Sequence, residues 1–509
     1  TMPAMNSDPH QSEPDHPDAT AHPPLASATP HPPRRWWLKR IALAVVLFIA
    51  GFITLFVIWH RVADQRLQAA IDKIKAAGEP LYPEDFNTPP IPYEDNAAVL
   101  YGQAAELLTD ERQRAEHDRL TMCMAWEADE DKLMSTCGAL IASHEDGQTL
   151  IRKARRRAGV HWGLDFDSPL LDYIAQPLQN YRAMSKLLYV DARLQYQGGN
   201  HGEFVEILSD MHALAGAIDH QPMLVPHLTV ITVNSLALSL VEEIGTQLAI
   251  KTQPGVNNSQ AARPEAVQAL IKQLLNEDAF ASEVVNAFRF ERAMQLDSVL
   301  MVASGKMATN TQWFKASLQT SIAPTHLLLG PLFESDGLWM MEHMSDEIEA
   351  IQSPSYPEYQ DCMRRASSLG KRPAGGPKGI RNLLSSILMP SLGRAASAHY
   401  RALGQRRMAA IALAIRLFEV NRGHRPRTLD ELVPDYLPTV PADPMSSNGV
   451  IQYLPNAEHP RLYSIGLDGI DDGGEYVYIR GGDYIDVNAA DMPFFLDSKP
   501  PAPNDESDE

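Results

Sequence analysis

The hydrophobic pattern of the chain begins with a long uncharged run, from Ile41 to Ile58. As a helix, the run IALAVVLFIAGFITLFVI would span about 27 Å, close to the thickness of the hydrocarbon core of a bilayer. Tryptophans stand at both ends of the run, where their amphipathic rings favour the membrane–water boundary: Trp36, Trp37 and Trp59. The pattern therefore predicts one transmembrane helix over residues 34–60.

Basic residues flank this run unequally, and the asymmetry predicts its orientation. Arg34, Arg35, Lys39 and Arg40 precede the run, whereas only His60, Arg61 and Arg66 follow it. Because the more basic side stays in the cytosol, we expect a single-pass protein of the cell membrane with its N-terminus cytosolic and its C-terminal region periplasmic. A cleaved signal peptide is the alternative, but the run is long for one and no small-residue cleavage site follows it.

On either side of the span the polar pattern changes. Residues 1–33 are rich in Pro, His, Ser and Ala and have almost nothing to bury, which predicts a disordered cytosolic tail. After the span, residues 61–78 are predicted to form a helical stalk continuous with it, ending at a glycine. Its apolar positions recur at helical spacing: Val62, Leu67, Ile71 and Ile74.

Residues 79–394 are predicted to form an irregular, extracytoplasmic helical domain. The stretch 79–92 contains four prolines and should be extended. Apolar residues then recur with a period near 3.6 in several segments: 94–108, 170–250 (three helices), 264–276, 278–304, 337–352 and 378–396. The uncharged stretch Met223 to Val241 is too polar for a second span and has no basic flanks, so we expect it in the middle of a bundle.

From residue 395 the pattern changes again and predicts a small α+β module over 395–490. A long helix ends at Gly423, and Thr428 with Glu431 forms a capping box that opens a short helix. Three short antiparallel strands follow, at 451–454, 461–465 and 476–479, and residues 491–509 are predicted to be a disordered acidic tail. The fold class expected is therefore mainly α, with one transmembrane helix and a short antiparallel sheet near the C-terminus.

Charge and cysteine content narrow the classes of partner. The formal net charge is −20, which argues against nucleic acid as a partner. The one dense basic run, Arg152 to Arg157, is predicted to be a solvated helix face, with contact to anionic lipid as the alternative. In an oxidising compartment Cys123 and Cys137 could pair, although spacing alone does not decide it; Cys362 is then left over.

Catalytic motifs are missing from the sequence: it has no Gly-x-Ser-x-Gly elbow, His-Glu-x-x-His, P-loop or dinucleotide fingerprint. We therefore assign no catalytic and no cofactor-binding residue. Three groups of polar residues are interpreted as structural. His212, His220 and His227 are interpreted as polar helix positions, and Asp165 and Asp167 as loop acids. A charged group on one helix is interpreted as an ion-paired surface: Glu283, Arg289, Glu291 and Arg292.

The C-terminal block RLFEVNRGHRPRTLDELVPDYLPTVPADP, followed by IQYLP and RLYSIGLDGIDDGGEYVYI, resembles the C-terminal region of the major pseudopilin of type II secretion systems. The resemblance covers about ninety residues, and the chain as a whole resembles uncharacterised bacterial single-pass proteins. The matching positions are Gly423, Pro426, Leu429, Leu432, Leu437, Pro438, Asp443, Pro444, Tyr453, Tyr463, Ser464, Gly466, Asp468, Gly469, Gly473 and Gly474.

The resemblance implies a calcium site in the loop after the Asp-Gly turn. Carboxylate and carbonyl oxygens on a bent loop suit this ion, and the equivalent residues here are Asp468, Asp471 and Asp472, with Asp483 and Asp486 further on. The alternative interpretation is that these acids only shape tight turns. Calcium is the one cofactor that the sequence suggests.

Three functions remain open at this point. The first is a membrane-anchored interaction or structural protein of the envelope, linked to secretion or envelope assembly, with the lipid bilayer and envelope proteins as partners. The second is a periplasmic hydrolase or ligand-binding protein whose site is assembled from distant helices. The third is a true pilin component, which the long insertion between the span and the pseudopilin-like module disfavours.

Overall fold

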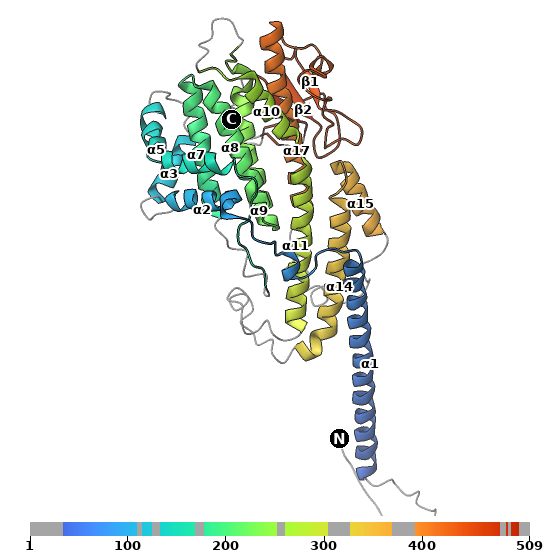
Figure 1. Ribbon diagram of the computed structural model, residues 1–509. Helices are drawn as coiled ribbons and strands as arrows, with labels where there is room; N and C mark the ends of the chain where they lie inside the picture. The colour runs from blue at the N-terminus through green and yellow to red at the C-terminus, as the bar shows by residue number, and fades with distance from the viewer. Residues whose placement is uncertain are drawn as a thin grey trace, which may run out of the picture. The chain divides into compact units, whose positions relative to one another are not determined.

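The computed structural model describes residues 34–108, 114–124, 133–167, 178–251, 260–303, 326–368, 392–478, 485–486 and 490–497. The predicted tail at 1–33 lies outside these residues, as does most of the predicted helix at 378–396. The described chain is mainly helical, with one small antiparallel sheet, as the pattern predicts (Figure 1). It divides into two units, residues 1–59 and 60–509.

The first unit is described from residue 34 and consists of the first part of helix α1 (Arg34–Ala76). Its apolar side chains between residues 41 and 58 are almost all exposed, and Arg40 lies 3.6 Å above the ring of Trp36. A helix of this length with such an apolar surface is a candidate membrane span or signal sequence.

The second unit begins with the rest of α1, which does not form the free stalk that we expected. The helix does continue to Ala76, and Gly78 follows with a positive φ of 71°. However, its apolar stripe is buried against two later helices, α11 (Asp278–Ala303) and α14 (His326–Ala350), at Leu296, Val299, Phe333, Met340 and Met341. That stripe consists of Leu67, Ile71 and Ile74. The predicted stalk is therefore part of the helical body, because its stripe is wide enough to need a partner.

The proline-containing stretch 79–92, predicted to be extended, contains the 3-10 turn η1 (Pro83–Phe86), because proline suits the first position of such a turn. A group of short helices follows it: the 3-10 turn η2 (Tyr93–Asp95), then α2 (Ala97–Leu108), α3 (Arg114–Met124), the short π-helix η4 (Leu133–Cys137), α5 (Gly138–Ala142) and α6 (Glu145–Ala154). A disulfide joins Cys123 at the end of α3 to Cys137 at the end of η4, with 6.1 Å between their Cα atoms. The pairing left open by the sequence is thus present, and Cys362 is free.

The three helices predicted within 170–250 form the middle of the body. They are α7 (Leu178–Gln197), α8 (His201–Asp219) and α9 (Leu224–Ile244), which the 3-10 turn η6 (Gly245–Gln247) extends. Figure 1 shows them side by side, and each packs on the other two. Helix α9 is apolar and long enough to cross a membrane, but it is largely buried among α7, α8, α11 and α17, as expected for a core helix.

Three of the remaining helices, α10 (Pro264–Leu275), α11 (Asp278–Ala303) and α17 (Leu392–Arg422), lie close to their predicted positions. Helix α14 (His326–Ala350) begins well before the predicted 337, and α15 (Tyr356–Ser368) was not predicted. Residues 408–415 of α17 have no exposed side-chain surface at all. This helix packs on α9 and α10 and, further along, on two strands of the sheet, so it joins the helical body to the C-terminal module.

The C-terminal module has the predicted order of helix, capped turn and sheet. Gly423 ends α17 with a φ of 78°, and the Glu431 carboxylate accepts a hydrogen bond from the backbone N–H of Thr428 at the start of the 3-10 turn η7 (Leu429–Leu432). Strands β1 (Gln452–Leu454) and β2 (Arg461–Ser464) pair antiparallel, close to the predicted bounds.

The third strand is a correction to the sequence analysis. It is β3 (Met492–Phe495), which pairs antiparallel with β2, and not the predicted 476–479; Tyr478 forms only an isolated bridge with Ile485. Part of the predicted tail at 491–509 is therefore ordered. The physical reason is burial, because β3 and the residue after it bury four apolar side chains whereas Val477 is half exposed. Those four are Met492, Phe494, Phe495 and Leu496.

The close contact of α11 with α14 gives a test of this fold. A Cβ added at Gly337 would lie 2.6 Å from Cγ1 of Val299, so we expect Gly337→Ala to lower the free energy of unfolding by about 1–3 kcal/mol. In chemical denaturation of the purified protein, Gly337→Ala combined with Val299→Ala should be more stable than Gly337→Ala alone, since the second change removes the clashing methyl groups. Strictly additive losses would contradict this packing.

Candidate functional site: an aromatic pocket beside helix α2

A pocket of about 670 Å³ lies between the start of α2, the segment that precedes it and the loop that follows α6. The start of α7 and the residue Gln221 complete its lining. The lining residues are mostly apolar or aromatic: Pro90, Ile91, Tyr93, Asn96, Ala98, Val99, Gly102, Ala105, Glu106, His161, Trp162, Gly163, Leu164, Asn180, Tyr181 and Gln221. Cavities of this size are typical of sites for small molecules.

Asn96 joins the two loops that form the walls of this pocket. Its side-chain amide donates to the carbonyl of His161 at 2.7 Å, and its carbonyl oxygen accepts from the backbone N–H of His161 and of Ala98. Backbone hydrogen bonds between Gly159 and residues 95 and 97 add to this connection. A Cβ at position 159 would lie 2.8 Å from Cδ1 of Ile91, so a larger residue there would require the Ile91 side chain to move. The walls are therefore held in a defined position.

His161 is fully engaged within the wall. Its Nε2 lies 3.0 Å from the carbonyl oxygen of Thr88, and its Nδ1 accepts from the backbone N–H of Gly163 at 3.2 Å. A ring that accepts at one nitrogen and donates at the other is the neutral form of histidine. This residue therefore orders the wall, and neither ring nitrogen is available as a catalytic base.

The floor of the pocket is made by residues from three separate parts of the chain. Trp162 donates from Nε1 to the carbonyl of Ala217 at 2.8 Å, and its ring meets that of Tyr181 at 5.1 Å in a tilted, edge-to-face arrangement. The side-chain amide of Gln221 donates to the Tyr181 hydroxyl at 3.1 Å. Burial raises the pKa of Tyr181 to about 12, so the hydroxyl keeps its proton.

The chemistry of this lining favours binding over catalysis. Among the described residues that line the pocket there is no Ser, Thr, Cys, Lys or Arg, so they supply neither a hydroxyl or thiol nucleophile of these kinds nor a fixed cation. The sequence did not single out Trp162, Tyr181 or Gln221. Their only signal was the presence of aromatic residues in or beside loops, which does not reveal that they converge.

The structure places the predicted calcium ligands on an exposed loop. The Asp468 carboxylate accepts from the backbone N–H of Ile470, and that of Asp471 accepts from the backbone N–H of Gly473 and the hydroxyl of Tyr463. Asp472 is exposed. Of the two acids further on, Asp486 lies within the described residues and Asp483 lies outside them. Among the described residues, no three His, Cys, Asp or Glu side chains are grouped as a metal site. The contacts of Asp468 and Asp471 are those of acids that shape turns.

Asp491 is an acidic residue near this loop that the sequence analysis missed. It is fully buried, and its Oδ2 accepts from the backbone N–H groups of Asp472 and Gly474 at 3.1 and 2.8 Å. Its Oδ1 is buried and has no hydrogen-bond partner among the described residues. Burial raises the pKa of Asp491 to about 6, and the charges of Asp471 and Asp472 add to the effect. The signal that could have found it is the apolar run immediately after it.

Two of the three histidines singled out earlier, His220 and His227, lie near the carboxyl of Glu283, whose pKa burial raises and the charges of both histidines lower. His220 is exposed and lies 2.9 Å from the carbonyl of Gly216, whereas His227 is buried. The Nδ1 of His227 lies 2.7 Å from an Asp219 carboxylate oxygen, and its Nε2 lies 3.2 Å from Nδ1 of His399. His399, on α17, was not predicted.

The His227–His399 pair is closed off from solvent. The ring of His399 stacks on Phe280 with 4.6 Å between centroids, and that of His227 stacks on Phe280 at 4.9 Å. Burial and the nearby charges of His227 and Arg406 hold the pKa of His399 well below its usual range. This pair crosslinks α9 to α17 through the core and does not line the aromatic pocket.

Helix α11 corrects the prediction of an ion-paired surface. Glu291 and Arg292 do not belong to an ion-paired surface, because α1, α9 and α14 enclose the helix and leave Glu291 only 7% and Arg292 only 1% exposed. Burial raises the pKa of Glu291 to about 7. Arg292 donates to the Glu79 carboxylate at 2.7 Å and so fastens the segment after α1 to the body. Asp165 and Asp167 are exposed loop acids, as expected.

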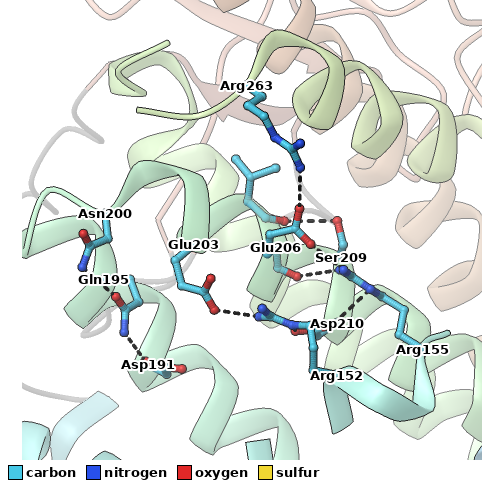
Figure 2. Close-up of polar contacts among 11 residues, drawn as sticks. Arg152, Arg155, Asp191, Gln195, Asn200, Glu203, Glu206, Ser209, Asp210 and Arg263 are labelled. Atoms are coloured by element: carbon cyan, nitrogen blue, oxygen red, sulfur yellow. Dashed lines mark hydrogen bonds and ion pairs between the residues drawn. The ribbon is translucent and has the colours of Figure 1, made fainter. Parts of the chain in front are cut away.

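The basic run at the end of α6 differs from its prediction in part: Lys153 and Arg156 are exposed, as expected of a solvated face, whereas Arg152 and Arg155 are half-buried. Figure 2 shows Arg152 and Arg155 directed at three acids of α8, with Asp210 shared between them. Arg152 donates to Asp210 at 2.5 Å and to Glu203 at 2.8 Å, while Arg155 pairs with Glu206. These two arginines therefore hold α6 against α8 and are not a solvated or lipid-binding face.

Comparison with known proteins finds no match to the chain among family models, curated proteins or solved structures.

The position of Asp491 gives the calcium prediction a test. A buried carboxyl whose pKa is raised on folding stabilises the fold only while protonated, so its contribution is lost as the pH rises from about 4 through about 6. If calcium binds this loop, millimolar calcium should raise the melting temperature by a few degrees above pH 6 and less below it.

Asp491→Asn should remove most of this calcium effect, whereas Asp435→Asn, at an exposed position outside the loop, should retain it. Differential scanning calorimetry with calcium and with a chelator measures both. An equal calcium effect in the two variants, or none in the parent protein, would rule out a calcium site that uses Asp491.

Proposed function

We propose that this protein is a membrane-anchored ligand-binding protein whose helical body lies outside the cytoplasm. The observation that carries the proposal is the aromatic pocket beside α2, a concave site with fixed walls and a buried phenol at its floor. Such pockets, mostly apolar with a few placed polar groups, are where small molecules bind. Of the functions left open by the sequence, binding at a site assembled from distant helices fits this geometry best.

Two features support the location. The exposed apolar part of α1 carries Arg and Lys at its N-terminal end and Trp residues at both ends, as expected of a span with a cytosolic N-terminus. The Cys123–Cys137 disulfide belongs to the body, and such bonds persist in oxidising compartments such as the bacterial periplasm. The bilayer is then a partner of α1, while the body meets ligands and proteins of the envelope.

A role in envelope assembly or secretion is a second candidate, and it rests on the C-terminal module. The helix, the capped turn and the sheet occur in the order found in the pseudopilin-like resemblance. Two large apolar side chains, Ile470 and Val477, are at least half exposed near its acidic loop. An envelope protein is the partner that we propose for this module.

The oxidation state of the cysteines tests the location in living cells. Cells are quenched in acid, denatured and treated with a maleimide carrying a polyethylene glycol mass tag. A body in an oxidising compartment should take up one tag, at Cys362, and three after reduction. Three tags without reduction, at native expression level, would place the body in a reducing compartment and contradict the proposal.

Filling the pocket tests the ligand-binding function. Gly102 lines the pocket, and a Cβ added there meets no atom within 4 Å, so Gly102→Leu should fold and place its side chain in the cavity. We expect the protein in nanodiscs to bind N-phenyl-1-naphthylamine, measured by fluorescence against empty nanodiscs, and Gly102→Leu to weaken binding at least tenfold.

Gly216→Leu is the matched control, because Gly216 also lies in a helix, is exposed, and has open space around an added Cβ. It should bind the probe like the parent protein. Equal binding by both variants would show that the probe occupies another place, and no binding by the parent protein would refute an accessible apolar pocket.

A further inference from the structure

We propose that the ligand of this pocket is a neutral molecule with a flat apolar body and one hydrogen-bond acceptor, to which the Tyr181 hydroxyl donates a hydrogen bond. This inference rests on the proposed ligand-binding function and names the class of ligand. It starts from the hydrogen bonds of the tyrosine.

The Tyr181 hydroxyl donates a hydrogen bond to none of the described residues. A phenol oxygen can accept a hydrogen bond and donates one of its own. Gln221 fills the accepting side by donating its amide N–H at 3.1 Å, and among the described residues no acceptor is bonded to the hydroxyl proton. The Tyr181 side chain is buried and lines the pocket. Since a buried donor without an acceptor costs free energy, an acceptor on the ligand would be favoured here.

The charges around the pocket favour a neutral ligand. The described part of its lining contains no Lys or Arg that could pair with an anion, and both ring nitrogens of His161 are engaged in the wall. Glu106, the one acid among the described lining residues, is exposed. A charged ligand would lose its hydration without gaining a buried counter-ion, which is costly.

The shape of the floor favours a flat apolar body. Trp162 and Tyr181 meet edge to face, so a planar ligand can contact the face of one ring and the edge of the other. The lining offers few free polar groups, since the side chains of Asn96, His161 and Trp162 are all engaged within the protein. A sugar or another ligand with many hydroxyls would find few partners, whereas a ketone, ester or amide attached to an aromatic ring would find one.

Two probes of almost the same shape test this inference: 2-acetylnaphthalene, which has a carbonyl acceptor, and 2-ethylnaphthalene, which has none. Each competes with N-phenyl-1-naphthylamine for the full-length protein in nanodiscs, and the ratio of the two affinities is measured. Tyr181→Phe should shift this ratio against the ketone by about 2- to 10-fold, the effect of one net hydrogen bond, and leave the hydrocarbon unaffected.

Tyr196→Phe is the matched control, because the Tyr196 hydroxyl bonds to Gln247 and does not line the pocket. Its ratio should equal that of the parent protein. If both probes compete but Tyr181→Phe leaves the ratio unchanged, the ligand class is wrong while the proposed function stands. If neither probe competes and Gly102→Leu has no effect on the reporter dye, the binding function itself is refuted.

Discussion

The structure depends on the burial of the middle of one helix, α17. Eight consecutive residues, 408–415, have no exposed surface, so this part of the helix has no solvent face and needs partners on every side. Helices α9 and α10 supply them from the body, and strands β2 and β3 supply them from the C-terminal module. Gly404 permits the close approach of the strands, since a Cβ there would lie 3.0 Å from Cε of Met492. The module and the body therefore share one hydrophobic core, and neither can lose its contact with α17 without exposing it.

The pocket lies on a different part of the same core, and polar contacts as well as apolar burial hold it together. Its walls are α2 and two loops, which are joined by Asn96 and by the hydrogen bonds around Gly159. Its floor comes from Trp162 in the loop after α6, from α7 and from the turn after α8, which the packed body holds in place. Loops fixed by polar contacts on a rigid helical scaffold are where ligand sites usually occur. The burial that holds the helices together thus also keeps Tyr181 and Gln221 close enough to form their hydrogen bond.

Much of the helical fold could be predicted from apolar periodicity, because α7, α8, α10 and α11 carry apolar residues at helical spacing between clear breaking residues. The prediction failed where burial depends on partners distant in sequence. Residues 61–78 looked like a free stalk because nothing local reveals α11 and α14, and β3 looked like a tail because proline and acidic residues surround its short apolar run. The pocket could not be predicted, since Tyr181 and Gln221 are 40 positions apart and ordinary in their local context.

The central claim is that the aromatic pocket holds a small neutral molecule, and native mass spectrometry of the protein purified gently from its own membranes tests it most directly. The account predicts that the parent protein carries one such molecule in a one-to-one complex, and that Gly102→Leu, whose added side chain fills the pocket, does not. The same adduct on both proteins, or an empty parent protein that also gains no mass from an excess of 2-acetylnaphthalene, would contradict it.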